Sequence, residues 1–251
     1  MVGLRMMRAA LLLVAVLLTT TSPVLADTLP KGNCDAPAPK TDLTHCKFAG
    51  GKFLKADFHG ANLSGLDLTN TDFQGCNLEG ANLAGADLQW SKFMGCNLKN
   101  ANLSETKLFH TRFDDSDMSG AKMIKAFMFG TNINFVNAPG ADLTGANMKD
   151  VNMEETSIAG GSLRDAYMLR GFLMGSDFSN ADLSGADMTG TTSEEVNFSG
   201  AKLHNTTLKG SHLERASFEG ADLKGADVTN AVFDETNFKG ARNLPAGVPA
   251  Q

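Results

Sequence analysis

The chain has 251 residues, enough for one or two domains, and 42% of them are hydrophobic, a normal share for a globular protein. With 20% charged residues and only 7 prolines, its composition excludes both a disordered tail and a collagen-like rod. The formal net charge of −6 argues against a surface that binds the phosphate backbone of nucleic acids.

Residues 1–26 have the pattern of a secretory signal peptide. Arg5 and Arg8 precede an apolar run over 9–18, and the small residues Val24 and Ala26 stand three and one before a cut. The run is too short to span a bilayer, and no Cys follows the cut to carry a lipid. We therefore expect an exported chain without a membrane span, either periplasmic or secreted. In a photosynthetic organism the corresponding compartment is the thylakoid lumen. An anchoring or buried N-terminal helix is the alternative.

Residues 41–240 repeat with a period of five. In blocks written from Thr41, the third place holds Leu, Ile, Val, Met or Phe in all 40 blocks except at Ala138 and Ser193. The first place is small or β-branched except at Leu66, Asp or Asn fills the second in 23 blocks, and Gly fills the fifth in 20. Because a period of five gives neither a helical stripe nor one face of a strand, the chain must turn once per block. Gly supplies the positive φ that such turns need, and Asp or Asn can accept bonds from nearby amides.

A second period of 20 residues indicates how the blocks are arranged. Phe53, Phe73, Phe93 and Phe113 recur at this spacing, and Phe recurs in the same way over 178–238. The pattern predicts a solenoid in which four blocks complete one coil and identical side chains lie above one another. Ten coils at the spacing of β-strands would form a rod roughly 48 Å long.

These blocks resemble the pentapeptide repeat family, whose motif is Ala-(Asp/Asn)-Leu-x-x. Ala-Asn-Leu-Ser-Gly at 61–65 and Ala-Asp-Leu-Ser-Gly at 181–185 are examples. The resemblance implies an all-β fold, a right-handed quadrilateral β-helix of about ten coils. The expected organisation is a signal peptide at 1–26, an N-terminal cap at 27–40, the β-helix at 41–240 and a short C-terminal tail at 241–251.

The two ends of the rod differ in their expected covering. The segment 27–40, with three prolines and Cys34, is expected to shield the first coil. The tail after Gly240 is too short for a capping helix, so we expect the last coil, with Phe238, to be exposed and adhesive. This predicts that two copies pair as a homodimer through the C-terminal end.

Two blocks interrupt the pattern of the interior. Ala138 and Pro139 together remove a large side chain and a backbone donor, which predicts either a bend in the rod or a local defect filled by neighbours. Ser193 predicts a local underpacked spot in preference to a nucleophile.

The four cysteines invite disulfides in an exported protein. Cys34 and Cys46 lie 12 residues apart, and a bond between them would fix the cap to the first coils. Cys76 and Cys96 lie 20 apart at inward places, so they should be stacked neighbours, either bridged or present as buried thiols.

No catalytic, cofactor or metal site is identifiable in the sequence. The chain contains no Ser/His/Asp grouping, phosphate-binding loop or paired-carboxylate pocket that we can assign. The histidines fall at outward places on different sides and coils, without the spacing of metal ligands. They are His45, His59, His110, His204 and His212. We therefore expect a protein that is not an enzyme and that needs no cofactor.

One side of the solenoid, built on Phe48, Leu68, Leu88 and their equivalents, is named here the aromatic side. It carries the only Trp and the only Tyr of the chain at outward places. Clustered exposed aromatic residues predict a protein-binding surface. The alternatives are that a few rings fold over the surface or that the patch covers a crystal or dimer contact. The candidate residues are Trp90, Phe109, Phe127, Phe129, Tyr167 and Leu169.

The next side, built on Phe53, Phe73 and Phe93, is named the acidic side. Ten acidic residues stand there against five basic ones, with acidic pairs on alternate coils. The charge predicts either a solvated edge that resists aggregation or attraction of a basic partner or weakly bound cations. The pairs are Asp114-Asp115, Glu154-Glu155, Glu194-Glu195 and Asp234-Glu235.

Three functions remain open. The first is a non-enzymatic exported scaffold or adaptor that binds a protein partner through the aromatic side. The second follows from the resemblance, because some pentapeptide repeat proteins are acidic DNA mimics that bind DNA gyrase. Export, the crowding of acids on one side and the uninterrupted repeat all disfavour that function. The third is a passive structural spacer.

Overall fold

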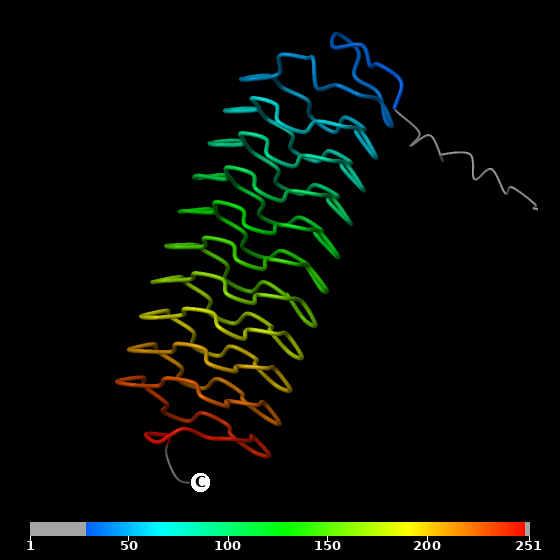
Figure 1. Ribbon diagram of the computed structural model, residues 1–251. Coiled ribbons are helices and arrows are strands. Elements are labelled where there is room, and N and C mark those ends of the chain that lie inside the picture. Colours follow the sequence, from blue (N-terminus) through cyan, green and yellow to red (C-terminus); the bar gives the residue numbers. More distant parts are fainter. Residues whose placement is uncertain (1–28, 249–251) are drawn as a thin grey trace, which may run out of the picture.

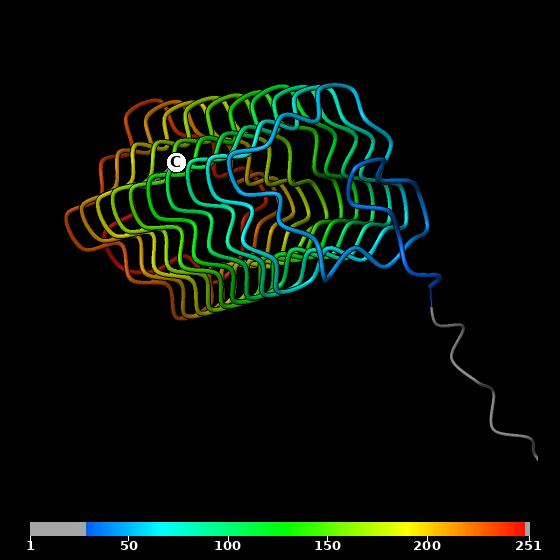
Figure 2. The ribbon, with the colours of Figure 1, turned by 90° about the horizontal axis from the view of Figure 1, so that it is seen from above.

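The chain winds into one four-sided solenoid in the computed structural model, which describes residues 29–248 (Figure 1). Each coil takes 20 residues, from coil one at 41–60 to coil ten at 221–240, and bridges between residues 20 apart keep the coils in register. Seen from above, successive coils repeat the same outline (Figure 2). The expected all-β, right-handed quadrilateral β-helix is confirmed. The expected signal peptide at 1–26 lies outside the described residues.

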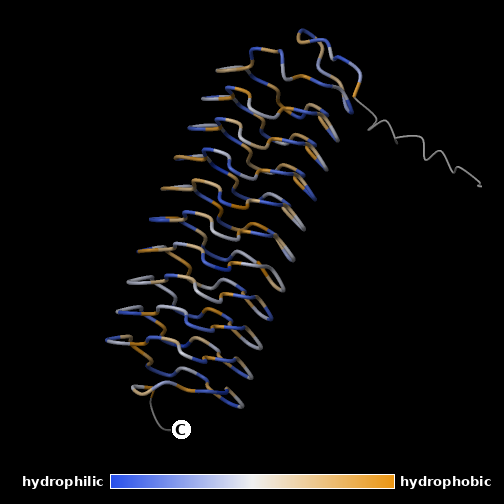
Figure 3. Cartoon of the chain, in the orientation of Figure 1, coloured by the Kyte–Doolittle hydropathy of each residue, from blue (hydrophilic) through white to orange (hydrophobic). Residues whose placement is uncertain are grey.

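Every block has the same local structure. Within 29–248 there is no helix and no multi-residue strand; single residues at the second place form parallel bridges to residues 20 before and 20 after. Lys92, for example, bridges Asp72 and Arg112. The third-place side chain points inward and the next two residues turn the corner. Figure 3 shows hydrophilic and hydrophobic residues alternating along each coil.

The corners are turns that require a positive φ at the fifth place. In a typical block the amide of Cys96 donates to the carbonyl of Phe93 at 3.1 Å, with Gly95 between them at φ 66°. Only the second central residue has positive φ, as in a type II turn. His45 is the one fifth-place residue of 41–240 without it. Bulky residues also adopt it, Trp90 at 63° and Phe135 at 57°, although this region costs a side chain about 1–2 kcal/mol.

Asp and Asn at the second place hold the turn from outside. The amide of Thr44 donates to Oδ1 of Asp42 at 3.0 Å, and the same bond recurs along the rod. Between coils, Asn side chains bond to one another: Nδ2 of Asn82 donates to Oδ1 of Asn62 at 3.1 Å. The predicted bonding of these residues to nearby amides is confirmed.

The interior is filled by stacked side chains. Ring centroids of Phe53 and Phe73 lie 5.5 Å apart, those of Phe73 and Phe93 4.9 Å, and those of Phe93 and Phe113 5.0 Å. The second ladder, over 178–238, has the same spacing. Small polar residues at the first place are satisfied internally, as where Oγ of Ser91 donates to the carbonyl of Leu68 at 2.6 Å. The predicted stacking is confirmed.

The two irregular blocks are absorbed without a break in the ladder. Asn137 forms bridges to Asp117 and Ser157 across the position of Ala138. Pro139 stands at the fourth place, whose amide elsewhere bonds only to side chains, so no inter-coil donor is lost. Buried Ser193 donates to Oγ1 of Thr191 at 2.9 Å. Both positions are local variations of the interior.

The N-terminal segment is tied to coil one. Lys31 forms a parallel bridge to Asp42, and a disulfide joins Cys34 to Cys46, whose Cα atoms are 5.4 Å apart. Cys76 and Cys96 stay separate, because their thiols point at the carbonyls of Phe53 and Phe73 instead of at each other. Burial raises the pKa of Cys76 to about 11 and that of Cys96 to about 12.

The C-terminal end contradicts the expectation of an exposed last coil. Phe238 is only 3% exposed and Phe233 only 9%. Arg242 continues the bridging to Asp222, and Val248 packs against the core after a turn closed on Pro245. The tail thus covers Phe238 without a helix, while Leu244 within the tail is 43% exposed, and the pairing of two copies through this end stays a prediction.

Candidate protein-binding surface

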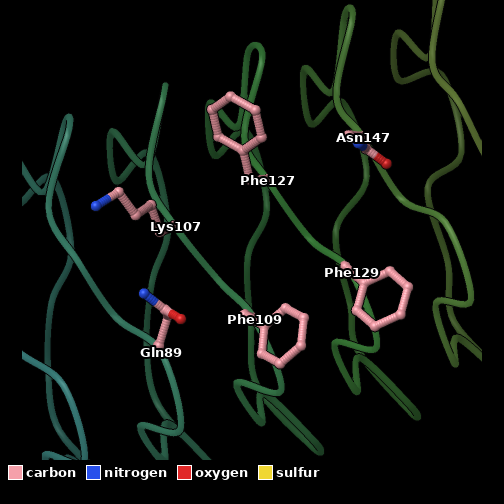
Figure 4. A pocket seen from close by; sticks show the side chains of 6 residues that line it. All are labelled: Gln89, Lys107, Phe109, Phe127, Phe129 and Asn147. Carbon is pink, nitrogen blue, oxygen red and sulfur yellow. The ribbon is translucent and has the colours of Figure 1, made fainter.

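A groove lies on the aromatic side across coils three to six. Its cavity volume is about 360 Å³. Apolar rings form most of its wall, and polar side chains stand at its edges (Figure 4). It is lined by Gln89, Lys107, Phe109, Phe127, Phe129 and Asn147. A volume of this size accommodates one or two large apolar side chains of a partner.

The rings of the groove are held by the solenoid repeat. Phe109 and Phe129 occupy the same place on successive coils and stack with centroids 5.0 Å apart at 13°. Trp90 continues the row, 5.9 Å from Phe109 and 4.5 Å from His110. Phe109 and Phe129 therefore cover one face of each other's rings and are held in place by the stack.

Two lysines stand at or beside this groove. Nζ of Lys149 stands 5.8 Å from the ring centroid of Phe129, and Nζ of Lys107 lies 3.1 Å from a carboxylate oxygen of Asp87. Farther along the side, Arg170 makes two bonds of 2.8 Å to Asp150 and holds the pKa of that carboxyl below its usual range. Lys107 and Arg170 are thus each paired with an acid of the same side, whereas Lys149 has no ion-pair partner within 29–248 and is the free positive charge beside the groove.

The six predicted aromatic-side residues divide into two sets. Trp90 and Phe127 are 53% and 57% exposed, and with the half-buried Phe109 and Phe129 they gather at or beside the groove. Tyr167, 37% exposed, lies two coils beyond Phe127, with Asn147 between them. Leu169 is half-buried on the same coil as Tyr167. These two extend the surface but do not line the groove.

The predicted acidic pairs differ in their partners. Arg215 bonds to Glu194 at 3.1 Å and to Glu195 at 2.9 Å, and these carboxylates raise its pKa. Asp114 pairs with Arg112 at 3.0 Å. Within 29–248 no ion pair joins the remaining members to a base. They are Asp115, Glu154, Glu155, Asp234 and Glu235.

Sequence reasoning missed that the acidic side is also apolar. Phe135 and Phe172 are 58% and 51% exposed, and Met174 is exposed beside Phe172. A count of charged residues does not include these apolar residues. Assigning every outward residue to a side by its place in the 20-residue period would have placed them between the acidic pairs. His110 was likewise left out of the aromatic side, where it packs against Trp90 and Phe109.

One group of three metal-type ligands occurs in the described part of the chain. Cys34, His45 and Cys46 have ligand atoms within 4.8 Å of one another. The two sulfurs are joined to each other, which leaves the His45 imidazole as the single available ligand. Three other histidines pair with acids: His59 with Asp57, His204 with Asp222, and His212 with Glu214. Over residues 29–248 no helix has the length and apolarity needed to cross a membrane.

Family comparison agrees with the geometry. The profile described as pentapeptide repeats matches in overlapping segments from 40–75 to 211–242, leaving no gap between them. The chain belongs to the pentapeptide repeat family. No curated protein sequence matches this pentapeptide repeat protein.

Two solved structures are similar to this pentapeptide repeat protein. HetL, a pentapeptide repeat protein involved in heterocyst differentiation regulation from the cyanobacterium Nostoc sp., is 25% identical with a TM-score of 0.62. The match covers 84% of this chain and 92% of HetL. A trypsin-treated form of QnrB1, a plasmid-mediated fluoroquinolone resistance protein, is 21% identical over 73% of this chain and 92% of QnrB1, with a TM-score of 0.66. The QnrB1 match shows the fold alone.

Proposed function

We propose that this pentapeptide repeat protein is a non-enzymatic exported scaffold that binds a protein through the groove of its aromatic side. The observation that carries the proposal is the groove itself: exposed Phe127 and the stacked Phe109 and Phe129 line it, with Lys107 at the edge. Large aromatic anchors with a polar rim are typical of protein-binding hot spots.

The backbone supports the same function. Trp90 occupies a left-handed position that half of the blocks fill with Gly, and yet its ring is more than half exposed. The ring packs against Phe109 and His110 and still leaves about half of its surface in contact with solvent, where a partner can reach it. The disulfide between Cys34 and Cys46 agrees with an oxidising compartment and thus with export.

The experiment replaces Phe127 by a photo-reactive aromatic amino acid in the full-length, exported chain. Irradiation in cells should cross-link a protein at this site, and Phe127→Ser should reduce recovery of the same protein by about tenfold or more. The matched control places the photo-reactive residue at Lys122, an exposed second-place residue of the same coil on the adjoining side. Equal products from both positions, or none from 127, would refute the proposed site.

Export is tested in the same cells. Mass spectrometry of the recovered chain should give an N-terminus at Asp27, in the periplasm or the medium. A cytoplasmic chain that retains residues 1–26 would refute export and return gyrase binding to consideration.

A further inference from the structure

We infer that the aromatic side binds the acidic side of a second copy of this chain. The inference rests on the proposed protein-binding role of the aromatic side and names its partner. A partner that fits the groove would present exposed apolar side chains together with carboxylates, because the wall is aromatic and Lys107 and Lys149 stand at or beside it. The acidic side presents this combination, with Phe135, Phe172 and Met174 standing between the acidic pairs.

The two sides match coil by coil when two rods lie parallel at the same height. Coil four has Lys107 on the aromatic side, where it also pairs with Asp87, and Asp115 on the acidic side, which has no ion-pair partner within 29–248. Coil five has Phe127 opposite Phe135, both more than half exposed.

The alternation continues in the next two coils. Coil six has Asn147 and Lys149 opposite Glu154 and Glu155, none of these charges having an ion-pair partner within 29–248. Coil seven has apolar residues on both sides. They are Tyr167 and Leu169 opposite Phe172 and Met174.

The lateral positions agree as well. Because both copies wind in the same sense, the second place of one side faces the fourth and fifth places of the other. Lys107 and Phe127 are second-place residues, whereas Asp115 and Phe135 are fifth-place residues. The pairs Lys107 with Asp115 and Phe127 with Phe135 therefore meet directly.

The match is confined to the middle of the rod. Toward the ends the same arrangement brings like charges together, Lys47 with Lys55 in coil one and Asp227 with Asp234 in coil ten. The contact is thus centred on residues 107–174, and we expect reversible association that depends on protein concentration.

The symmetry of such an assembly follows from the four-sided cross-section. The aromatic and acidic sides are adjacent, so each contact turns the next copy by about a quarter of a circle. A head-to-tail contact of this kind closes into a ring of about four parallel rods, whereas two copies alone leave one aromatic and one acidic side unpaired.

The test uses sedimentation velocity and light scattering of the purified exported chain over a wide concentration range. Lys107→Glu and Asp115→Lys should each weaken association by about tenfold or more, because each places like charges at the contact. Lysine occupies the same turn position at Lys55 and Lys125, so Asp115→Lys is compatible with the fold. Circular dichroism checks that each variant is folded, and Lys122→Glu, which makes the same charge change on the adjoining side, should leave association unchanged.

Charge reversal gives the decisive arm. The double variant K107E/D115K should assemble again, and a mixture of the two single variants should also assemble, because a ring can alternate them. A monomer at every concentration, or an assembly unaffected by both single substitutions, would overturn the inference. A monomer that still cross-links a different protein through position 127 would overturn self-assembly and leave the proposed scaffold function standing.

Discussion

Stacked phenylalanines of almost the same geometry occur both inside and outside the solenoid. Phe93 and Phe113 stack at 5.0 Å and 17° in the interior, and Phe109 and Phe129 stack at 5.0 Å and 13° on the surface. The interior pair is fully buried, whereas the exterior pair is half-buried and borders a groove. The repeat alone sets the stacking, and the side of the backbone on which a ring lies decides whether it stabilises the fold or is available to a partner.

The largest expected difference between the interior and exterior stacks comes from truncating one phenylalanine side chain in each to alanine. Phe93→Ala should lower the free energy of unfolding by about 3–5 kcal/mol, because it leaves a cavity in a closed interior. Phe129→Ala should cost about 1 kcal/mol or less, because its ring is already partly in water. Urea denaturation followed by circular dichroism measures both. Equal losses would mean that the exterior stack is part of the core.

Loss of the disulfide in the N-terminal cap should lower the free energy of unfolding by less than Phe93→Ala but by more than Phe129→Ala. Replacing Cys34 and Cys46 by Ser should lower stability by about 2–4 kcal/mol, measured by thermal unfolding. The matched change, Cys76→Ala, removes a buried thiol without a bond and should cost about 1 kcal/mol.

Thiol titration is the control for this comparison. Burial and the raised pKa values of Cys76 and Cys96 should protect both thiols from alkylation in the folded chain. In denaturant without reductant only these two should react. Reaction of all four cysteines under those conditions would contradict the Cys34–Cys46 link.

Substitution of Phe135 should have opposite effects on stability and on association. Phe135→Gly should raise the free energy of unfolding by up to about 1 kcal/mol, because it relieves a left-handed backbone at φ 57° and loses an exposed side chain. The same substitution should abolish the proposed association, which light scattering measures. Trp90→Gly should gain less stability, because its ring packs against His110. Destabilisation by Phe135→Gly would show that this ring contributes to the fold.

The smallest expected effect concerns the charged exterior. Burial opposes ionisation of Asp182, but bonds from Ser184 and Arg164 and the charge of Lys202 outweigh it and hold its pKa at about 2, below the ordinary 3.8. A pKa depressed by folding stabilises the protein above the unfolded value, and this stabilisation is lost as the pH falls from about 4 to about 2. Asp182→Asn should reduce the dependence of thermal stability on pH across this window, leaving the part due to Asp222 and Asp227, whose pKa values are also about 2. An unchanged dependence would contradict the assignment.

The interior could be predicted almost completely from the sequence, because a period of five and a period of 20 leave one way to stack Phe53 on Phe73. The exterior could be predicted only in part. Summing the charges identified the acidic side but did not reveal Phe135 and Phe172, because uncharged residues do not enter the sum and the sum ignores which coil each residue occupies. The C-terminal expectation was wrong because Val248 lies beyond the repeat, where no periodic signal indicates that it folds back.

The coil of 20 residues has a consequence for how such a chain changes length. Removing one coil would shorten the rod yet return every later residue to its original side, so both the aromatic and the acidic surfaces would survive with fewer members. Removing a single block would rotate all that follows by a quarter turn, and the aromatic residues beyond the deletion would continue along a neighbouring edge. Duplication or deletion of gene segments can therefore preserve a surface only when whole coils of 20 residues are gained or lost. The coil, and not the five-residue block, is the unit by which this fold can change length and keep its surfaces.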